Sequence, residues 1–303
     1  LLFGPYCSVS TFRRIQPDRR CRVEQVGNGL HQLVCGLAKA VLLSGQFYLL
    51  LQQMQAASKE HNTFFFSWLY QLLFFLYVYF QITGYTDMVR GIAACYGYSL
   101  PKNSRLPLWN KQLSVFLQNW NRTIQRWFFR AFSPAKKTEN ALWLQTLFAY
   151  SILGWFCRGT LTGFLGGLLV GVILAWFEDV QRKWKFPTAI HWFLSIVCSV
   201  FAWSLFCSDT LTEAVQMWSN LLGLSKDAVS YQDLYFLQSS LLLLLIAGFC
   251  TSGWHRSIQK WLKKRTLTAW IPTIVVPVGD VLFLGLCVLA MASDAVPPLF
   301  FRW

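Results

Sequence analysis

Charged residues are scarce in this chain of 303 residues: Asp, Glu, Lys and Arg together make up 13%, about half of their share in an ordinary soluble domain. Disordered chains are rich in charge and poor in aromatic residues, whereas this chain is 17% aromatic. The shortage of polar surface also argues against a soluble nucleic-acid-binding domain, which needs a well-solvated surface around its basic patch. We therefore expect a folded protein with no nucleic-acid partner.

Motifs for disulfide or metal sites are also missing. The nine cysteines are scattered through apolar segments without a Cys-x-x-Cys pair, and no two histidines stand at metal-ligand spacing. Disulfide frameworks and zinc sites are recognised in sequences by such paired motifs. The sequence therefore predicts no metal site and favours cysteines that act as small hydrophobic residues.

The composition is instead apolar and basic: 55% of the residues are hydrophobic and the net charge is +14. A profile of this kind is typical of an integral membrane protein whose cations gather on one side. Seven hydrophobic runs are long enough to cross a bilayer as helices, namely residues 30–51, 63–86, 141–157, 159–177, 187–208, 234–255 and 268–293. The sequence predicts an all-α integral membrane protein of about seven spans, forming a single polytopic domain over residues 1–303.

Ionisable or helix-breaking residues interrupt two of these runs. The first run includes Lys39, which makes it the strongest candidate for a re-entrant segment. The last run includes Pro272, Pro277 and Asp280, which predict a kink or a break. A charge at membrane depth is expected to be functional or paired. We expect Lys39 to pair with Asp87 at the end of the second run, in a structural or tunnel-lining role.

Cations are concentrated in alternate connecting segments. Residues 1–29, 87–140, 178–186 and 256–267 hold 22 of the 27 Lys and Arg residues, and the intervening segments hold four. Because cytoplasmic loops of membrane proteins are enriched in Lys and Arg, the pattern predicts that these basic loops face the cytoplasm.

The longest basic segment, residues 87–140, is predicted to be a cytoplasmic loop with an interfacial helix at 112–132. Apolar residues recur there at helical spacing, and Arg122, Arg126 and Arg130 follow at every fourth position on another stripe. Such a helix lies in the membrane interface with its cations towards the headgroups. Alternatively, the three arginines bind an anionic donor such as the phosphates of coenzyme A.

Close packing between helices is predicted around the fourth run. Gly163, Gly166, Gly167 and Gly171 provide small residues at the spacing that lets two membrane helices approach each other. The alternative is that these glycines line a tunnel.

Several short motifs resemble those of membrane-bound O-acyltransferases. Residues 80–88 read Phe-Gln-Ile-Thr-Gly-Tyr-Thr-Asp-Met, and residues 97–103 read Gly-Tyr-Ser-Leu-Pro-Lys-Asn. They are similar to the family's aromatic-x-x-Ser/Thr-Gly-Tyr-Ser-Asp-Met and the Gly-Phe-x-x-Pro-x-Asn turn that follows it. Residues 36–40, 116–127 and 154–171 resemble further family segments in the same order. The resemblance is closest to the bacterial membrane subunit of alginate O-acetylation, with the D-alanine exporter of teichoic acids as a relative.

This resemblance implies a multi-pass protein of the inner membrane, with further spans preceding this chain. It implies transfer of an acyl group, with acetyl favoured, from acyl-CoA or an acyl carrier through a membrane tunnel towards a cell-envelope polysaccharide. It also implies an extracytoplasmic acyltransferase as a partner, the lipid bilayer as the surroundings and no tightly bound cofactor.

The histidines of the family's chemistry are replaced in this chain. The resemblance places them at Asn121, Cys157 and Val170, and the four histidines present lie elsewhere. Cys157 is a candidate nucleophile, since a thiolate favoured by the neighbouring Arg158 can carry an acyl group. Asn121 can only form hydrogen bonds. Three readings therefore stay open: an acyltransferase with an unusual catalytic set, an inactive scaffold or partner subunit, and an unrelated transporter.

Overall fold

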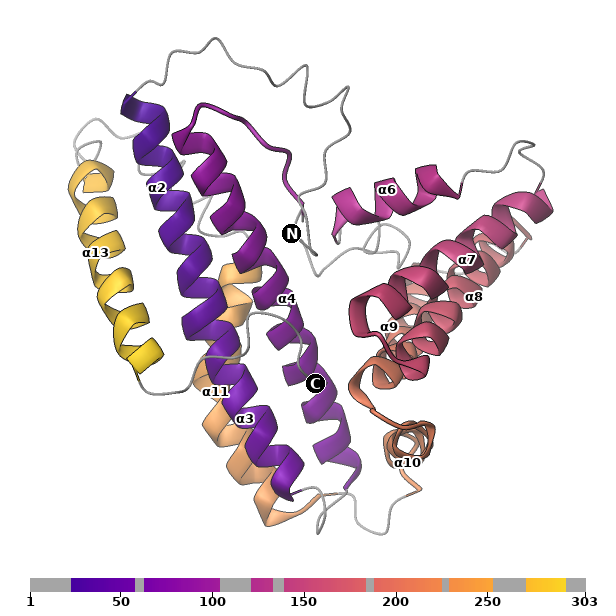
Figure 1. Cartoon of the computed structure of the whole chain (residues 1–303). Coiled ribbons are helices and arrows are strands. Elements are labelled where there is room, and N and C mark those ends of the chain that lie inside the picture. The colour runs from indigo at the N-terminus through magenta and orange to yellow at the C-terminus, as the bar shows by residue number, and fades with distance from the viewer. Residues whose placement is uncertain are drawn as a thin grey trace. The chain divides into compact units, whose positions relative to one another are not determined.

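The computed structural model describes residues 23–57, 63–103, 121–132, 139–183, 188–224, 229–252 and 271–292. Within these ranges the regular elements are helices and there is no strand (Figure 1). The all-α prediction is confirmed. The elements are α2 (Val23–Ala38), η1 (Lys39–Leu43), α3 (Ser44–Ala57), α4 (Phe64–Cys95), α6 (Arg122–Ala131), α7 (Glu139–Arg158), α8 (Leu161–Lys183), α9 (Thr188–Cys207), α10 (Leu211–Leu221), α11 (Tyr231–Ser252) and α13 (Ile271–Ala292).

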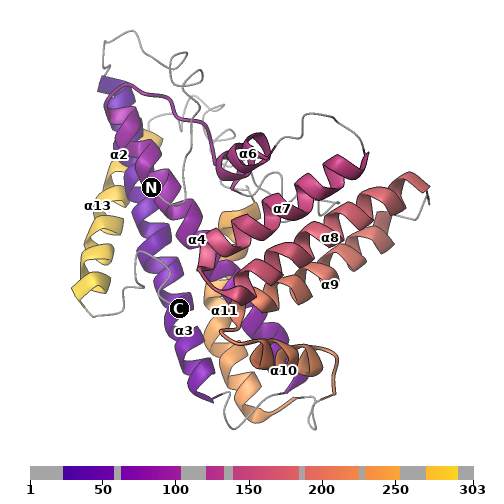
Figure 2. The ribbon, with the colours of Figure 1, turned by 45° about the vertical axis from the view of Figure 1, so that its right-hand side comes forward.

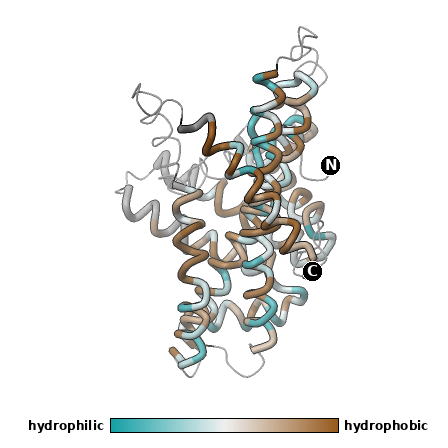
Figure 3. Tube along the Cα trace, turned by 90° about the vertical axis from the view of Figure 1, so that its left-hand side faces the viewer, coloured by the Kyte–Doolittle hydropathy of each residue, from teal (hydrophilic) through white to brown (hydrophobic). Residues whose placement is uncertain are grey.

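Each of the seven hydrophobic runs falls mainly in a helix. Four helical segments of the described chain are long and apolar enough to cross a membrane: Val23–Ala57, Phe64–Cys95, Tyr231–Thr251 and Ile274–Ala292. The helices α8 and α9 contribute shorter apolar stretches. Figure 3 shows long hydrophobic stretches along the helices, interrupted by hydrophilic residues. The protein is therefore an all-α membrane protein, while the number of seven crossings stays a prediction.

Helix boundaries correct several details of the sequence prediction. The first run does not turn back on itself, because α2, η1 and α3 follow one another without a break. Over its described residues, 271–292, the last run is a continuous helix with Pro277 inside it, so no break occurs there. The loop predicted to begin at residue 87 begins after Cys95 instead, since Asp87 forms an ion pair with Arg90 one turn later and the helix continues through both.

The predicted helix at 112–132 also begins later than expected. Residues 112–120 lie outside the described ranges, and α6 begins at Arg122. Asn121 precedes it with a left-handed backbone (φ 44°), a conformation that a right-handed helix cannot contain. The described part of the amphipathic helix is therefore 122–131.

The chain divides into two compact units, and three of the helices contribute to both. The first unit comprises Leu1–Gln53, Leu76–Leu108 and Phe236–Pro298, and the second comprises Met54–Phe75, Trp109–Tyr235 and Leu299–Trp303.

Glycines bring α2 and α4 into close contact in the first unit. A Cβ atom on Gly36 would lie 2.7 Å from the carbonyl oxygen of Gly84, and one on Gly29 would lie 2.8 Å from that of Gly91. Seven residues, about two helical turns, separate the glycines on each helix, so each pair lies on one face. The two antiparallel backbones therefore touch along this face.

The second unit contains a tight hairpin of α7 and α8, beside which α9 runs (Figure 2). A Cβ on Gly167 would clash with the carbonyl of Tyr150, and one on Gly171 would lie 3.1 Å from the Cα of Leu147. Gly166 instead faces α9, where its Cβ would lie 2.9 Å from the ring of Phe206. Gly166, Gly167 and Gly171 therefore each lie at a close contact between helices.

Polar side chains cap the helices of the second unit. Ser230 and Asp233 form a capping box at the start of α11, because the Asp233 carboxylate accepts from the Ser230 backbone at 2.7 Å while the Ser230 hydroxyl accepts from the Asp233 backbone. The Thr63 hydroxyl at the start of α4 donates to the same carboxylate at 2.7 Å and accepts from the backbone of Phe66. The starts of α4 and α11 are thereby joined through Asp233, which is fully buried.

Candidate functional site

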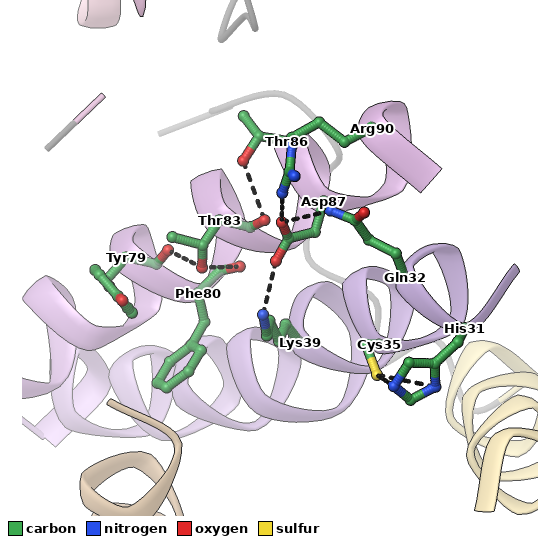
Figure 4. Close-up of polar contacts among 10 residues, drawn as sticks. All are labelled: His31, Gln32, Cys35, Lys39, Tyr79, Phe80, Thr83, Thr86, Asp87 and Arg90. Atoms are coloured by element: carbon green, nitrogen blue, oxygen red, sulfur yellow. Dashed lines mark hydrogen bonds and ion pairs between the residues drawn. The ribbon is translucent and has the colours of Figure 1, made fainter. Parts of the chain in front are cut away.

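A cluster of charged side chains lies between η1 and α4 in the first unit (Figure 4). Lys39 Nζ lies 2.7 Å from Asp87 Oδ2, and Arg90 Nη1 lies 3.1 Å from Asp87 Oδ1. Gln32 Nε2 donates to Oδ1 at 3.3 Å. The predicted pair of Lys39 and Asp87 is therefore present, and Arg90 and Gln32 are partners that the sequence reasoning missed. We call these four residues the charged cluster.

The glycine contacts explain why the charged cluster can form. Lys39 follows Gly36 by three residues, and Asp87 follows Gly84 by three residues. Residues three apart lie on nearly the same face of a helix, so both charged side chains stand beside the point where the backbones touch. An aspartate is short, and it reaches Lys39 only because no side chain holds the two helices apart.

The backbone at Lys39 is also irregular. The π-helical segment η1 begins at Lys39, whose carbonyl oxygen accepts from the backbone of Ser44 five residues later. Single π-helical turns occur frequently at functional sites, because they rotate side chains away from the regular helical positions. In the first unit this irregular turn begins at Lys39, one of the two cations that contact Asp87.

The charged cluster carries one more positive than negative charge. Asp87 accepts from two cations and one amide, so its carboxylate is occupied and poorly placed to act as a base. Arg90 additionally donates to the carbonyl of Leu100 at 3.3 Å. The arrangement can hold two helices together and can attract an anion, but it offers no free proton acceptor of its own.

A second polar group, which the sequence reasoning missed, lies two turns before Lys39 on α2. His31 Nδ1 lies 2.9 Å and 3.1 Å from the two carboxylate oxygens of Asp280 on α13. Cys35 Sγ lies 3.7 Å from His31 Nε2 and 3.8 Å from Nδ1. Asp280 is thus paired within the apolar run, as expected for a charge at membrane depth. The i, i+4 spacing of His31 and Cys35 was visible in the sequence, but the approach of α13 was not.

The helix α6 has the predicted amphipathic character. Ile124 and Phe128 are buried, whereas Arg126 and Arg130 are exposed and Arg122 is half-buried. The arginines therefore lie where an anionic headgroup or donor can reach them. Their role as donor-binding residues stays a prediction.

Comparisons with known proteins agree with the motif order. No family model matches the chain. Over 52% of its own length, the chain is 24% identical to a peptidoglycan O-acetyltransferase of Helicobacter pylori. Over 74% of its own length, it is 21% identical to a probable alginate O-acetylase of Pseudomonas syringae. Over 68% of its own length, it is 23% identical to a teichoic acid D-alanyltransferase of Bacillus subtilis. These three similar proteins are membrane-bound O-acyltransferases. The matches cover 32%, 44% and 58% of these three relatives, so the chain spans only part of their length.

The membrane-bound O-acyltransferase motifs have a physical explanation in the first unit. The motif at residues 80–88 supplies Gly84 and Asp87, and the motif at 36–40 supplies Gly36 and Lys39. In each motif a glycine makes the close contact and a charged residue one turn later makes the ion pair. The two motifs are therefore two sides of one helix–helix contact.

The three positions at which the resemblance places the family histidines lie in the second unit. Asn121 is buried at the start of α6, Cys157 is half-buried in the last turn of α7, and Val170 lies within α8. Val170 packs against an apolar cluster that includes Tyr150 and Ile173. That position therefore has no capacity for proton transfer and serves the core of the unit.

Arg158, the cation beside Cys157, is engaged elsewhere. Its side chain is 3% exposed, and Nη2 lies 2.5 Å from Asp209 Oδ1 at the end of α9. Asp209 is 58% exposed, and its carboxylate offsets part of the positive charge that would otherwise favour a thiolate at Cys157. The predicted activation of Cys157 by Arg158 is weakened by this pairing.

Proposed function

We propose that this protein is a membrane-bound O-acyltransferase that moves an acyl group, with acetyl favoured, towards a cell-envelope polysaccharide. The observation that carries the proposal is the similarity to three proteins named for transfer to peptidoglycan, alginate and teichoic acid. Each match covers more than half of this chain. The charged cluster supports the proposal because it lies on two of the family motifs.

The proposed arrangement places the protein in the inner membrane with its basic loops in the cytoplasm. The donor is acyl-CoA or an acyl carrier, whose phosphates are attracted by Arg122, Arg126 and Arg130 on α6. An extracytoplasmic acyltransferase partner takes up the acyl group and completes its transfer to the polysaccharide. The excess of cations in alternate loops supports this orientation.

Cys157 is the proposed acyl carrier. Its sulfur attacks the carbonyl carbon of the donor thioester, a new thioester bond forms and the bond to the donor sulfur breaks. The proton of the Cys157 thiol passes to the departing donor thiolate. A hydroxyl of the acceptor then attacks the acyl-cysteine, which returns Cys157 to its thiol. Asn121, at another of the family histidine positions, is proposed to donate a hydrogen bond during transfer.

A second candidate function is a catalytically inactive subunit that keeps the fold as a membrane scaffold for a partner. Two observations favour it: Val170 is packed in an apolar cluster, and Arg158 is paired with Asp209. Neither position then assists acyl transfer. The names of the three relatives describe acyl transfer, which argues against an unrelated transporter.

The two candidates are separated by complementation in the native host. A strain lacking the gene receives the full-length wild type, Cys157→Ala or the matched control Cys198→Ala, which alters a cysteine of α9 in the same unit. The acyl content of the envelope polysaccharide is then measured. We expect the wild type and Cys198→Ala to restore acylation and Cys157→Ala to fail.

Other outcomes decide between the readings. If Cys157→Ala restores acylation fully, the cysteine is not the acyl carrier, although the protein remains an acyltransferase component. If purified wild type with its partner turns over no acyl donor while the gene is still needed for acylation, the scaffold function is correct.

A further inference from the structure

Three side chains that commonly bind metals converge in the first unit. The ligand atoms of His31, Cys35 and Asp280 all lie within 4.8 Å of one another. Two come from α2 and the third from α13, 245 positions further along the chain than Cys35. Their convergence is therefore a property of the packed helices and not of a local motif.

The spacing of these atoms suits a tetrahedral ion. Bond lengths of about 2.0–2.3 Å around Zn²⁺ place neighbouring ligand atoms roughly 3.3–3.8 Å apart in a tetrahedron. The observed separations are 2.9 Å from His31 Nδ1 to Asp280 Oδ1 and 3.8 Å from Nδ1 to Cys35 Sγ. An ion can be accommodated by side-chain shifts of about 0.5 Å or less at these two distances.

The chemistry of the donor set selects the metal. Mg²⁺ and Ca²⁺ prefer sites made of oxygen ligands, whereas a thiolate and an imidazole together with a carboxylate suit Zn²⁺. The negative charges of a Cys35 thiolate and of Asp280 balance the two charges of the ion. Lys39, which begins η1 four residues after Cys35, is already held by Asp87.

We propose that His31, Cys35 and Asp280 form a Zn²⁺ site that fastens α13 to α2, with water as the fourth ligand. Only 6% of the most apolar 18-residue stretch of α13 is buried within the structure. Few packing contacts therefore hold this helix against α2, and a shared ion would add to them. A carboxylate in an apolar helix is also costly unless its charge is compensated. This proposal does not depend on acyl transfer.

The site is tested with Co²⁺, which replaces Zn²⁺ in tetrahedral sites and reports a sulfur ligand through a thiolate-to-cobalt charge-transfer band. The full-length protein is purified in detergent, treated with a chelator and titrated with Co²⁺ and then with Zn²⁺. We expect the band to saturate at one ion per protein and to disappear when Zn²⁺ displaces the cobalt.

Variants identify the ligands. Cys35→Ser is expected to abolish the band, and Asp280→Asn to weaken Co²⁺ binding by at least about tenfold, since loss of even an outer partner costs about 10- to 100-fold. Cys95→Ser is the matched control, because this cysteine of α4 contacts the carbonyl of Val26 at 3.8 Å and not the site. Circular dichroism of each variant confirms that the helices persist.

The proposal makes a second measurable claim, which is that Zn²⁺ raises the unfolding temperature of the wild type but not of folded Cys35→Ser. It is overturned if the wild type shows no charge-transfer band at saturating Co²⁺. It is equally overturned if the band persists in Cys35→Ser or is lost in Cys95→Ser.

Discussion

Replacing Gly84 by alanine tests whether the close contact of α2 and α4 holds the charged cluster together. The added Cβ would lie 2.7 Å from the carbonyl oxygen of Gly36 and 2.8 Å from the backbone nitrogen of Ala40. Ordinary contacts of this kind are about 3.4 Å or longer, so the helices must separate by roughly 0.7 Å. The ion pair between Lys39 and Asp87, one turn away, must lengthen or rearrange.

The magnitude follows from two opposing effects. Overpacking of a tight contact costs about 1–3 kcal/mol, whereas replacing glycine by alanine inside a helix gains up to about 1 kcal/mol. Gly27, on the partner helix α2, has nothing within 4 Å of its would-be Cβ, so Gly27→Ala keeps only the gain. We expect Gly84→Ala to be less stable than Gly27→Ala by about 1–3 kcal/mol.

The assay is equilibrium unfolding of the purified protein in mild detergent, followed by tryptophan fluorescence and by circular dichroism. Gly36→Ala and the double variant with Gly84→Ala complete the series. Because one separation of the helices relieves both clashes, the double variant should lose less stability than the sum of the single variants. If Gly84→Ala is as stable as Gly27→Ala, the two backbones do not approach as described and the explanation of the charged cluster is wrong.

Three further predictions concern the ion pairs, the helix caps and the orientation. Asp87→Ala should lower the free energy of unfolding by about 1–3 kcal/mol. Lys39→Met should lower it less, because only Asp87→Ala leaves two cations without the carboxylate. Equal losses of unfolding free energy in the two variants would contradict this. Asp233→Ala should lower the free energy of unfolding by about 1–3 kcal/mol in the same assay. Thr63→Val should lower it less, since it leaves the capping box of Ser230 and Asp233 intact. The reverse order would refute the role of buried Asp233 in joining the two helix starts. A cysteine introduced at Arg126 should react with a membrane-impermeant maleimide only in permeabilised cells, and labelling of intact cells would place this loop outside.

Part of the charged cluster was predictable because few charges lie at membrane depth. Lys39 and Asp87 are of opposite sign and each lies in or beside a hydrophobic run, so pairing was the simplest way to stabilise both. Their other partners were not predictable, because Gln32 and Arg90 reach the carboxylate only through the rotation of the helix and the irregular turn at Lys39.

Errors in the helix boundaries have a common physical cause. Hydropathy falls at Asp87, and a run of apolar residues therefore ends there, but the helix continues because Asp87 and Arg90 neutralise each other within one turn. Conversely, regular spacing of apolar residues does not reveal that Asn121 adopts a left-handed backbone. Periodicity describes which residues share a face, and local charge pairs and backbone conformation decide where the helix begins and ends.

The sequence by itself determined the helical membrane class, because long apolar segments in lipid must satisfy every backbone hydrogen bond internally. It also determined that none of the four histidines stands where the resemblance places a histidine of the acyltransferase family. Only the tertiary structure decided that Arg158 contacts Asp209 and that His31 and Cys35 meet Asp280. These contacts join residues dozens to hundreds of positions apart, and they depend on how closely helices pack, which is set by the shapes of their touching faces and not by the pattern along any one segment.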